Sequence, residues 1–562
     1  MKVNANICDM ASAGVCDGLG DATHIQLETL DGGNITVADG VIVNTGGGTL
    51  TLNTSDSLSL GLNSQLSSAS DSGVGGAIKV TATDAITLSP GSVVDSGDAN
   101  IMLLAGGDVQ ISHLVSTQAA AIALDILSGG VISDTGTDDV DIEALNGGLS
   151  LVANNGIESL QIDAKKLAVA NKIGGLVDIS ALSDIELSQI ALVGNASIRS
   201  IGDMRISDAT PEFDGDVHLI VTGANKKLIL PDTGLPYTTE NTLRLTAPDI
   251  DNAGETRHIL IGAGHLILSS DFLGGATKID LNASQLSLTN TGGQALTVTD
   301  PNDLALGITS TPGAQFNLSL PGILTLKDIG NNFGVGSIVN LDVGDIKSQS
   351  SRSINAIGGN LHLTARVMPA SLTIDAGFDE ISLIEMNGAD IDILDSSGIN
   401  LRSISLTGGD LTVDSGQELT LLESIDLNGS HGSFISLEAD TSITFADSTF
   451  IKDSDLSTLD TLTLDLSAED GIDLGLGSEI NSYGGNVALD AGGHLRIHTQ
   501  SGINSDAGTI SLRGATTDIR GLISSLNTGI NAIEINSGVT ILETVIEDVS
   551  YPHRTLATNA PG

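Results

Sequence analysis

Aromatic side chains are nearly missing from this sequence. It has no Trp and only 3 Tyr and 8 Phe in 562 residues, although 40% of its residues are hydrophobic. A core must therefore be built from Leu, Ile, Val and Ala, which suit narrow and regular layers. The hydrophobic fraction also argues against disorder, which requires low hydrophobicity.

Positive charge is scarce as well. The chain has 22 Lys and Arg against 70 Asp and Glu, which gives a formal net charge of −48. This balance argues against nucleic acid as a partner, because nucleic-acid-binding proteins carry basic patches, and against an anionic membrane surface. Asp is far more common than Glu, a bias typical of turns.

The acidic turns allow two interpretations. They form a solvated surface that keeps the chain soluble, or some of them collect cations. Coils of a β-solenoid lie about 4.8 Å apart, inside the screening length of about 8 Å in physiological salt. Like charges stacked in register would repel, and bound calcium would relieve that repulsion. Apart from calcium, the sequence suggests no cofactor.

Cysteine is restricted to Cys8 and Cys16. Two cysteines this close can form one disulfide in an oxidising compartment; the alternative is a pair of inert thiols. A metal site is not expected, because neither a second Cys pair nor a nearby His pair supplies four ligands.

Long apolar runs are absent too. No stretch approaches 18 apolar residues, so we expect no transmembrane helix and no membrane insertion. Residues 1–6 lead into no apolar stretch of the kind found in signal peptides. We therefore expect either a piece of a longer polypeptide or export without an N-terminal signal.

Glycine, by contrast, is abundant, with 68 residues. Pairs of glycines introduce short runs in which apolar and polar residues alternate. The pairs are Gly47-Gly48, Gly75-Gly76, Gly147-Gly148, Gly358-Gly359, Gly408-Gly409 and Gly484-Gly485. Intervals of 72, 50 and 76 residues separate positions 75 and 147, 358 and 408, and 408 and 484. A unit of about 24 residues divides all three, which indicates a solenoid repeat.

The alternating runs predict strands. Examples are Ile78-Lys79-Val80 and Asp108-Val109-Gln110-Ile111, bounded by Gly, Asp or Ser. Two or three such strands per unit predict an all-β chain that folds as a right-handed parallel β-helix, a β-solenoid of roughly 24 residues per coil. One set of side chains then fills a narrow core and the other faces solvent. Glycine is expected at corners that need positive φ or close packing. Residues 160–170 also fit a helix, but their flanks favour strands.

The predicted organisation has five parts. They are an N-terminal lead-in or cap segment at 1–30, a β-solenoid at 31–205, a Pro-containing irregular insertion or junction at 206–260, the continued β-solenoid at 261–550 and an unstructured tail at 551–562. Insertions in repeat scaffolds often form the binding face. Within 206–260 the candidate ligand-binding residues are Lys226, Lys227, Tyr237, Arg244, Arg257 and His258. The alternative is a tolerated bulge or a weak junction.

No catalytic residues are predicted, and we expect no enzyme activity. Paired acids such as Asp138 and Asp139 arise by chance in so acidic a chain, and His494 and His498 are expected to decorate an exposed strand. Approximations to the calcium-binding nonapeptide occur at Asp31–Asn34 and Thr407–Leu411. Neither is followed by tandem copies, which a calcium roll needs.

Several sequence segments resemble the repeats of giant secreted bacterial surface proteins of the filamentous haemagglutinin-like type. They are GGVISDTG at 129–136, VDIEA at 140–144, GLSLVANNGIES at 148–159 and KLAVA at 166–170. Similar sequence patterns recur over about residues 31–540. The resemblance implies right-handed β-helices at an extracellular or bacterial cell-surface location, acting as an adhesin or matrix filament without catalysis. The implied partner is a cell-surface or matrix polysaccharide or protein.

Two departures from that family affect what we expect. The sequence contains neither an Asn-Pro-Asn-Gly secretion motif nor a C-terminal barrel or anchor, so we expect a repetitive shaft or rigid spacer, part of a longer polypeptide. One alternative function is a polysaccharide-active β-helix, either a lyase or a glycoside hydrolase, which predicts a groove of acidic and basic residues near 206–260. The other is a calcium-stabilised structural rod.

Overall fold

The computed structural model describes most of the chain. The described residues are 1–3, 7–8, 23–70, 74–136, 140–208, 210–231, 235, 241–252, 258–272, 278–290, 292, 295–310, 315–326, 331–333, 336–348, 354–355, 359–367, 371–375, 378–385, 390–427, 433–452, 461–527, 532–542 and 546–547. Cys16, Asp138, Asp139, Tyr237, Arg257 and the predicted tail at 551–562 lie outside them. Cys8 lies in a short strand, but its side chain is not described, so the disulfide stays a prediction.

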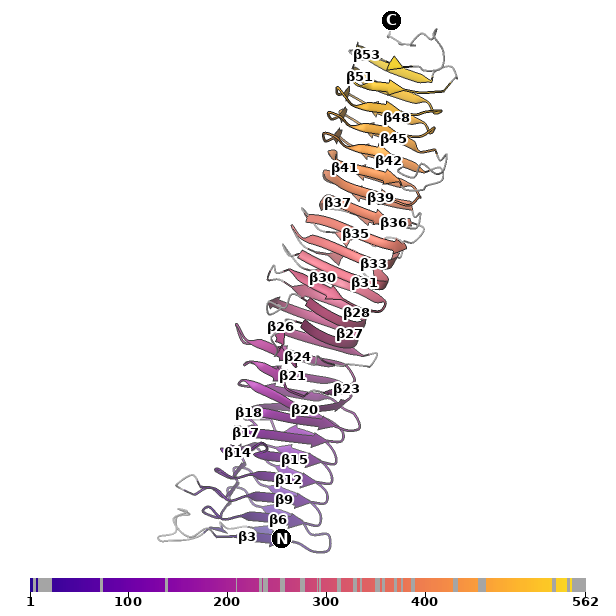
Figure 1. The fold of residues 1–562 in the computed structure, drawn as a ribbon. Helices are drawn as coiled ribbons and strands as arrows, with labels where there is room; N and C mark the ends of the chain where they lie inside the picture. Colours follow the sequence, from indigo (N-terminus) through magenta and orange to yellow (C-terminus); the bar gives the residue numbers. More distant parts are fainter. Residues whose placement is uncertain are drawn as a thin grey trace. The chain divides into compact units, whose positions relative to one another are not determined.

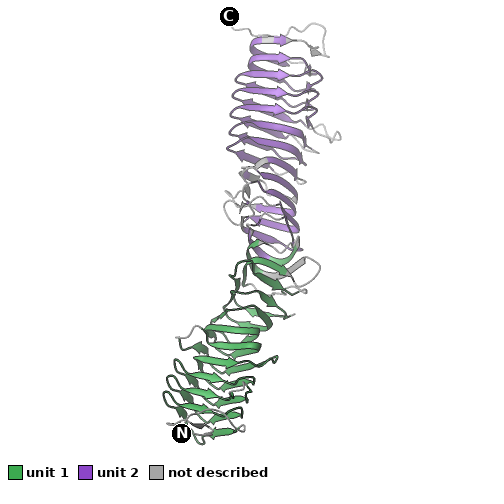
Figure 2. Ribbon diagram, turned by 90° about the vertical axis from the view of Figure 1, so that its left-hand side faces the viewer, with its two compact units in different colours: residues 1–283 green, residues 284–562 purple. Residues whose placement is uncertain are grey.

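The chain forms two compact units, residues 1–283 and 284–562 (Figure 2). Within each unit, strands of successive coils lie one above another (Figure 1) and pair in parallel about 23 residues apart. For example, Ile78 pairs with Ile101, and Ile101 pairs with Leu124. Among the described residues there is no helix, and hence none that is long and apolar enough to cross a membrane. The prediction of an all-β solenoid with coils of roughly 24 residues is confirmed.

The strands of unit 1 are β1 (Lys2–Val3), β2 (Ile7–Cys8), β3 (Ile25–Glu28), β4 (Ile35–Val37), β5 (Ile42–Asn44), β6 (Leu50–Thr54), β7 (Leu58–Leu60), β8 (Gln65–Ser67), β9 (Ile78–Ala82), β10 (Ile86–Leu88), β11 (Val93–Asp95), β12 (Ile101–Ala105), β13 (Val109–Ile111), β14 (His113–Ser116), β15 (Leu124–Ser128), β16 (Ile132–Asp134), β17 (Ile142–Ala153), β18 (Ile157–Asn171), β19 (Val177–Ala181), β20 (Ile185–Val193), β21 (Ala196–Ser200), β22 (Met204–Ile206), β23 (Glu212–Asp214), β24 (Val217–Val221), β25 (Lys227–Leu230), β26 (Thr242–Asn252) and β27 (His258–Phe272). The next strand, β28 (Lys278–Asn290), contains the boundary in the sequence.

The remaining strands, in unit 2, are β29 (Leu296–Thr299), β30 (Leu304–Ser310), β31 (Gln315–Leu326), β32 (Asn331–Asn332), β33 (Ile338–Ser348), β34 (Ile354–Asn355), β35 (Gly359–Val367), β36 (Ser371–Asp375), β37 (Phe378–Glu385), β38 (Asp390–Asp395), β39 (Ile399–Leu406), β40 (Leu411–Ser415), β41 (Leu419–Leu427), β42 (Phe434–Ala439), β43 (Ser442–Phe445), β44 (Phe450–Lys452), β45 (Thr463–Ala468), β46 (Gly471–Leu474), β47 (Glu479–Asn481), β48 (Val487–Ala491), β49 (His494–Ile497), β50 (Gly502–Asn504), β51 (Ile510–Ile519), β52 (Leu522–Ser524), β53 (Ile533–Leu542) and β54 (Ile546–Glu547).

The core is a stack of aliphatic layers. In β6 the side chains of Leu50 and Leu52 are fully buried, whereas Thr51 between them is only partly covered. Register places Ile78 of the next coil on Leu50. Burial of one such aliphatic side chain stabilises the fold by about 1.5–3 kcal/mol. Strand β18 confirms that residues 160–170 are extended rather than helical.

The paired glycines are required by close approach between coils. A Cβ atom on Gly485 would lie 2.1 Å from the carbonyl oxygen of Leu462, and one on Gly508 would lie 1.9 Å from that of Gly485. The first glycine of the pair, Gly484, has φ +109°. At this corner Ser482 Oγ donates to the oxygen of Gly485 at 2.7 Å, which satisfies a carbonyl that the turn leaves unpaired. The paired-glycine motif of the sequence therefore marks a corner of the solenoid.

The acidic turns connect successive coils. Asp39 Oδ1 accepts a hydrogen bond from the backbone N–H of Leu62, and Asp410 Oδ1 accepts one from that of Phe434, both at 2.8 Å. Equivalent contacts are made by Asn34, Asp98, Asp108, Asp184, Asn195, Asp203, Asp216, Asp303, Asp390, Asp447 and Asn486. Asp98 accepts from Gly75 in the preceding coil, and the other side chains of this set accept from the next coil. Bonds within the turn, which are typical of Asp, also occur: a backbone N–H two residues further on donates to each of Asp95, Asp208, Asp300 and Asp395.

Residues 206–260 contribute strands to the parallel ladder. The first part of β26 pairs with β24, up to Thr246, and its second part pairs with β25, from Asp249. Pro248 lies between these two segments, where no ladder hydrogen bond is needed from its nitrogen. The proline thus marks a change of partner strand within a continuous stack.

Candidate functional site

Lys226 is tied to the coils that precede it. Its Nζ lies 2.8 Å from Asp184 Oδ1 and 3.7 Å from Asp203 Oδ2. The hydrogen bond to Asp184 raises the pKa of Lys226, and the same bond is the main cause that lowers the pKa of the Asp184 carboxyl. These side chains are largely exposed, so solvent screens the pair. Lys226 therefore acts as a clamp between coils.

Lys227 faces the following coil instead. Its Nζ lies 2.9 Å from Asp249 Oδ2 and 3.2 Å from Asp251 Oδ2, both in β26. Hydrogen bonds to Asp249 and then to Asp251 raise the pKa of the Lys227 ammonium. The two adjacent lysines therefore do not form one basic site, because carboxylates of different coils neutralise each of them.

Arg244 has a different environment. It is exposed on β26 and makes no ion pair with any residue that the structure describes. Register places it beside His218 of β24, and His218 lies beside Ser197 of β21. Arg199, two residues after Ser197, points to the same side of that strand.

His218 lies on the coil between those of Arg199 and Arg244. Its Nε2 is 3.0 Å from Thr246 Oγ1. Burial lowers the pKa of His218, and the positive charges of Arg244 and Arg199 lower it further. We call Arg199, His218 and Arg244 the basic ladder. Sequence reasoning missed Arg199 and His218 as site residues; the signal for them was basic residues separated by about one coil length in an acidic chain.

Three of the other predicted residues stay untested. Tyr237 and Arg257 lie outside the described residues, and His258 is described only as the first residue of β27, without its side chain.

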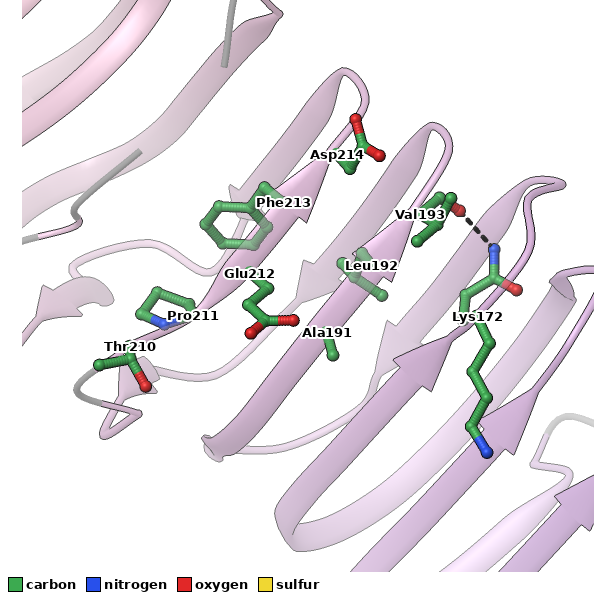
Figure 3. A pocket seen from close by; sticks show the side chains of 10 residues that line it. Lys172, Ala191, Leu192, Val193, Thr210, Pro211, Glu212, Phe213 and Asp214 are labelled. Atoms are coloured by element: carbon green, nitrogen blue, oxygen red, sulfur yellow. Dashed lines mark hydrogen bonds between the residues drawn. The ribbon is translucent and has the colours of Figure 1, made fainter. Parts of the chain in front are cut away.

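A pocket of about 560 Å³ opens beside β18, β20 and β23 (Figure 3). Ala191 lines the pocket and lies in register between Ala170 and Glu212. Lys172, Glu212 and Asp214 give the pocket charges of both signs. Phe213 also lines it but is only 5% exposed, so it offers little aromatic surface to a ligand.

Unit 2 has a hollow of similar size, about 700 Å³, along β47, β50 and β52. Gly502 lies in register between Glu479 and Leu522, so one outward side chain is missing there. Arg520, which also lines the hollow, pairs with Asp518 at 3.1 Å. Gly477 and Gly521 also line the hollow, so several of its lining positions carry no side chain.

Elsewhere several charged side chains form pairs across coils. Arg402 donates to Glu380 Oε2 at 3.0 Å and to Glu423 Oε1 at 2.9 Å. His498 Nε2 lies 3.4 Å from Asp473 Oδ1, and His494 is exposed. Within the described part of the chain, no group of three or more His, Cys, Asp or Glu side chains is placed to hold a metal ion.

Comparison with models of known protein families, with curated proteins and with solved structures finds no match. The fold defines the protein as a parallel β-solenoid repeat protein. Membership of the filamentous haemagglutinin-like group stays a prediction from the repeated sequence segments.

Proposed function

We propose that this chain is a non-enzymatic, extracellular structural shaft, presented on a bacterial surface, that acts in adhesion or as a rigid spacer. The observation that carries the proposal is the chemistry between coils. Asp and Asn side chains of one coil accept backbone hydrogen bonds from the next, as Asp39 does from Leu62 and Asp410 from Phe434. Side-chain cations likewise bridge neighbouring coils. Many of the polar side chains therefore connect neighbouring coils to each other.

A shaft needs stiffness more than it needs a cleft. Each coil continues the hydrogen-bond ladder of the last coil and adds one aliphatic layer, so resistance to bending is repeated along each unit. Closing the ladder between coils also leaves few free strand edges. These properties favour a protein that separates or presents other groups.

The test uses purified chain and an immobilised panel of polysaccharides and cell surfaces. Retention of protein and release of soluble oligosaccharide are scored in the same wells. Retention without release supports an adhesin. If neither retention nor release is observed, a spacer is favoured. Release of oligosaccharide would overturn the proposal.

A polysaccharide-active enzyme is the second candidate. Glu212 and Asp214 lie two residues apart on one face of β23 and both line the pocket with Lys172. Two carboxylates flanking a sugar are the basis of glycoside hydrolysis. If oligosaccharide is released, the variant Glu212→Gln should abolish the release, whereas Asp184→Asn, on a turn outside the pocket, should not.

A further inference from the structure

The basic ladder brings basic side chains of three successive coils together in an otherwise acidic chain. Many other cations in the described residues meet a carboxylate on a neighbouring coil, as Lys166 meets Glu186 and Arg513 meets Asp490, both at 3.1 Å. Arg199 and Arg244 meet none among the described residues. Lys79, Lys165, Lys172 and Arg205 share this property, so the feature that distinguishes the two arginines is their position beside His218 on successive coils.

Three positive or ionisable groups are instead placed together. His218 is one coil from Ser197 on one side and one coil from Arg244 on the other. With coils about 4.8 Å apart, the backbone positions of the ladder span about 10 Å along the stack. Burial and then the positive charges of Arg244 and Arg199 lower the pKa of His218, and neither arginine forms an ion pair with a described residue.

An unpaired cation pair on an acidic protein suits a bound anion. Guanidinium groups bind carboxylates through two parallel hydrogen bonds, which gives both strength and orientation. The hydroxyl groups of Ser197 and Thr246 lie on the same outward face, next to His218. Such a mixture of guanidinium and hydroxyl groups is suited to a sugar that carries a carboxylate.

The length of the ligand is limited by the surrounding charge. Asp178 precedes Ser197 in the same column of the stack, and residues 1–164 contain only two Lys or Arg residues, Lys2 and Lys79. A long polyanion bound at the basic ladder would run onto these acidic coils and be repelled within the screening length of about 8 Å. An isolated carboxylate would avoid that repulsion.

We propose that Arg199, His218 and Arg244 bind a glycan that ends in a carboxylated sugar. This inference rests on the proposed function as an adhesin and names the ligand class. Affinity for one sugar on an open surface is expected to be weak, so the assay uses many copies of the ligand, which raise the apparent affinity.

The probe is sialyllactose on a multivalent polymer, with lactose on the same polymer as the neutral control. Binding of the full chain to each surface is measured by biolayer interferometry. The test variant is Arg199→Gln/Arg244→Gln. The matched control is Lys166→Gln/Lys226→Gln, which removes the same charge from cations that are already paired. Hydrogen exchange of the strands confirms that both variants are folded.

We expect the wild type to bind sialyllactose at least tenfold more strongly than lactose. The arginine variant should lose this preference and the lysine variant should keep it. The proposal is overturned if the wild type shows no preference, if the arginine variant still binds, or if both variants lose binding equally. It is also overturned if heparin or single-stranded DNA binds through the same arginines and sialyllactose does not. Binding to other glycans that is independent of the arginines would leave the adhesin proposal standing and refute only this site.

Discussion

Substitution of Gly485 by Ala should disrupt the stack locally. The new Cβ would lie 2.1 Å from the oxygen and 2.4 Å from the carbonyl carbon of Leu462 in the preceding coil. Non-bonded carbon atoms normally stay about 3.5–4 Å apart. The turn must therefore move by roughly 1 Å, and backbone atoms on both sides leave no flexible side chain to absorb the shift.

The expected cost follows from the hydrogen bonds that this movement stretches. Ser482 Oγ donates to Gly485 O at 2.7 Å, Gly485 N donates to Ser482 O at 3.1 Å, and Leu464 N donates to Asn486 O at 2.9 Å. At about 1 kcal/mol net for each bond, the loss is about 3 kcal/mol. The range of about 1–3 kcal/mol measured for overpacked cores is consistent with this value.

Two other glycines separate the steric effect from backbone preference. A Cβ on Gly502 would meet nothing closer than Leu522 O at 3.7 Å, and its φ is not positive, so Gly502→Ala should be neutral or stabilise by about 0.4–1 kcal/mol. Gly477 has φ +75° but open space around its Cβ position, with only Ser448 Oγ at 3.6 Å. Gly477→Ala should therefore cost only about 1–2 kcal/mol, the price of a left-handed residue.

Amide hydrogen exchange measured by mass spectrometry is the appropriate assay, because a repeat protein need not unfold in one step. A local loss of about 3 kcal/mol corresponds to exchange roughly 150-fold faster in β45 and β48, since each 1.4 kcal/mol is a factor of ten. Peptides from unit 1 should be unchanged. Exchange in Gly485→Ala within threefold of wild type, or equal acceleration in Gly502→Ala, would refute the close-packing explanation.

Three further predictions concern the polar contacts between coils. Asp410→Ala should cost about 1 kcal/mol by leaving the N–H of Phe434 without its acceptor, whereas Asp410→Asn should be nearly neutral; exchange of the Phe434 amide checks both. Arg402 lowers the pKa of the Glu380 carboxyl, so this pair stabilises the fold above the unfolded pKa of about 4.3 and the contribution is lost as pH falls through the lower folded value. Glu380→Gln should therefore narrow the stability difference between pH 7 and pH 3 in urea unfolding, and an unchanged difference would contradict this. Raising NaCl from low to physiological concentration should raise the Tm, because the net charge is −48; calcium at matched ionic strength should add nothing, and an additional rise in calorimetry would favour the calcium-stabilised rod.

The fold could be predicted from the sequence because every coil repeats the same inward chemistry. An aliphatic residue at every second position, as in Leu50-Thr51-Leu52, suffices to place one face in the core. The paired glycines indicate the corners of the coils in the sequence alone, but the sequence does not show why glycine is required there. Close approach to a carbonyl one coil away, as at Gly485, is a property of the assembled stack that periodicity alone does not reveal.

The partners of charged residues were harder to predict because coil length varies. Leu149 pairs with Leu167 after 18 residues, whereas Ile451 pairs with Ile480 after 29. An average period of about 24 residues therefore cannot assign which side chains are neighbours. Lys226 and Lys227 illustrate the result: adjacent in sequence, they bind carboxylates in coils on opposite sides. The basic ladder was hidden for the same reason, since it depends on register between three coils.

The register that hid the basic ladder also separates stability from recognition. In β24 the inward residues Val217 and Leu219 carry the core, while His218 between them faces outward. Outward residues on such a strand can be substituted without disturbing the pairing of strands, because the backbone hydrogen bonds and the inward packing stay intact. Arg199 and Arg244 contribute no ion pair among the described residues, so their replacement by Gln should leave stability close to that of the wild type. Because the fold does not depend on the side chains of Arg199 and Arg244, their ligand should be sought before that of any lysine already neutralised by a carboxylate.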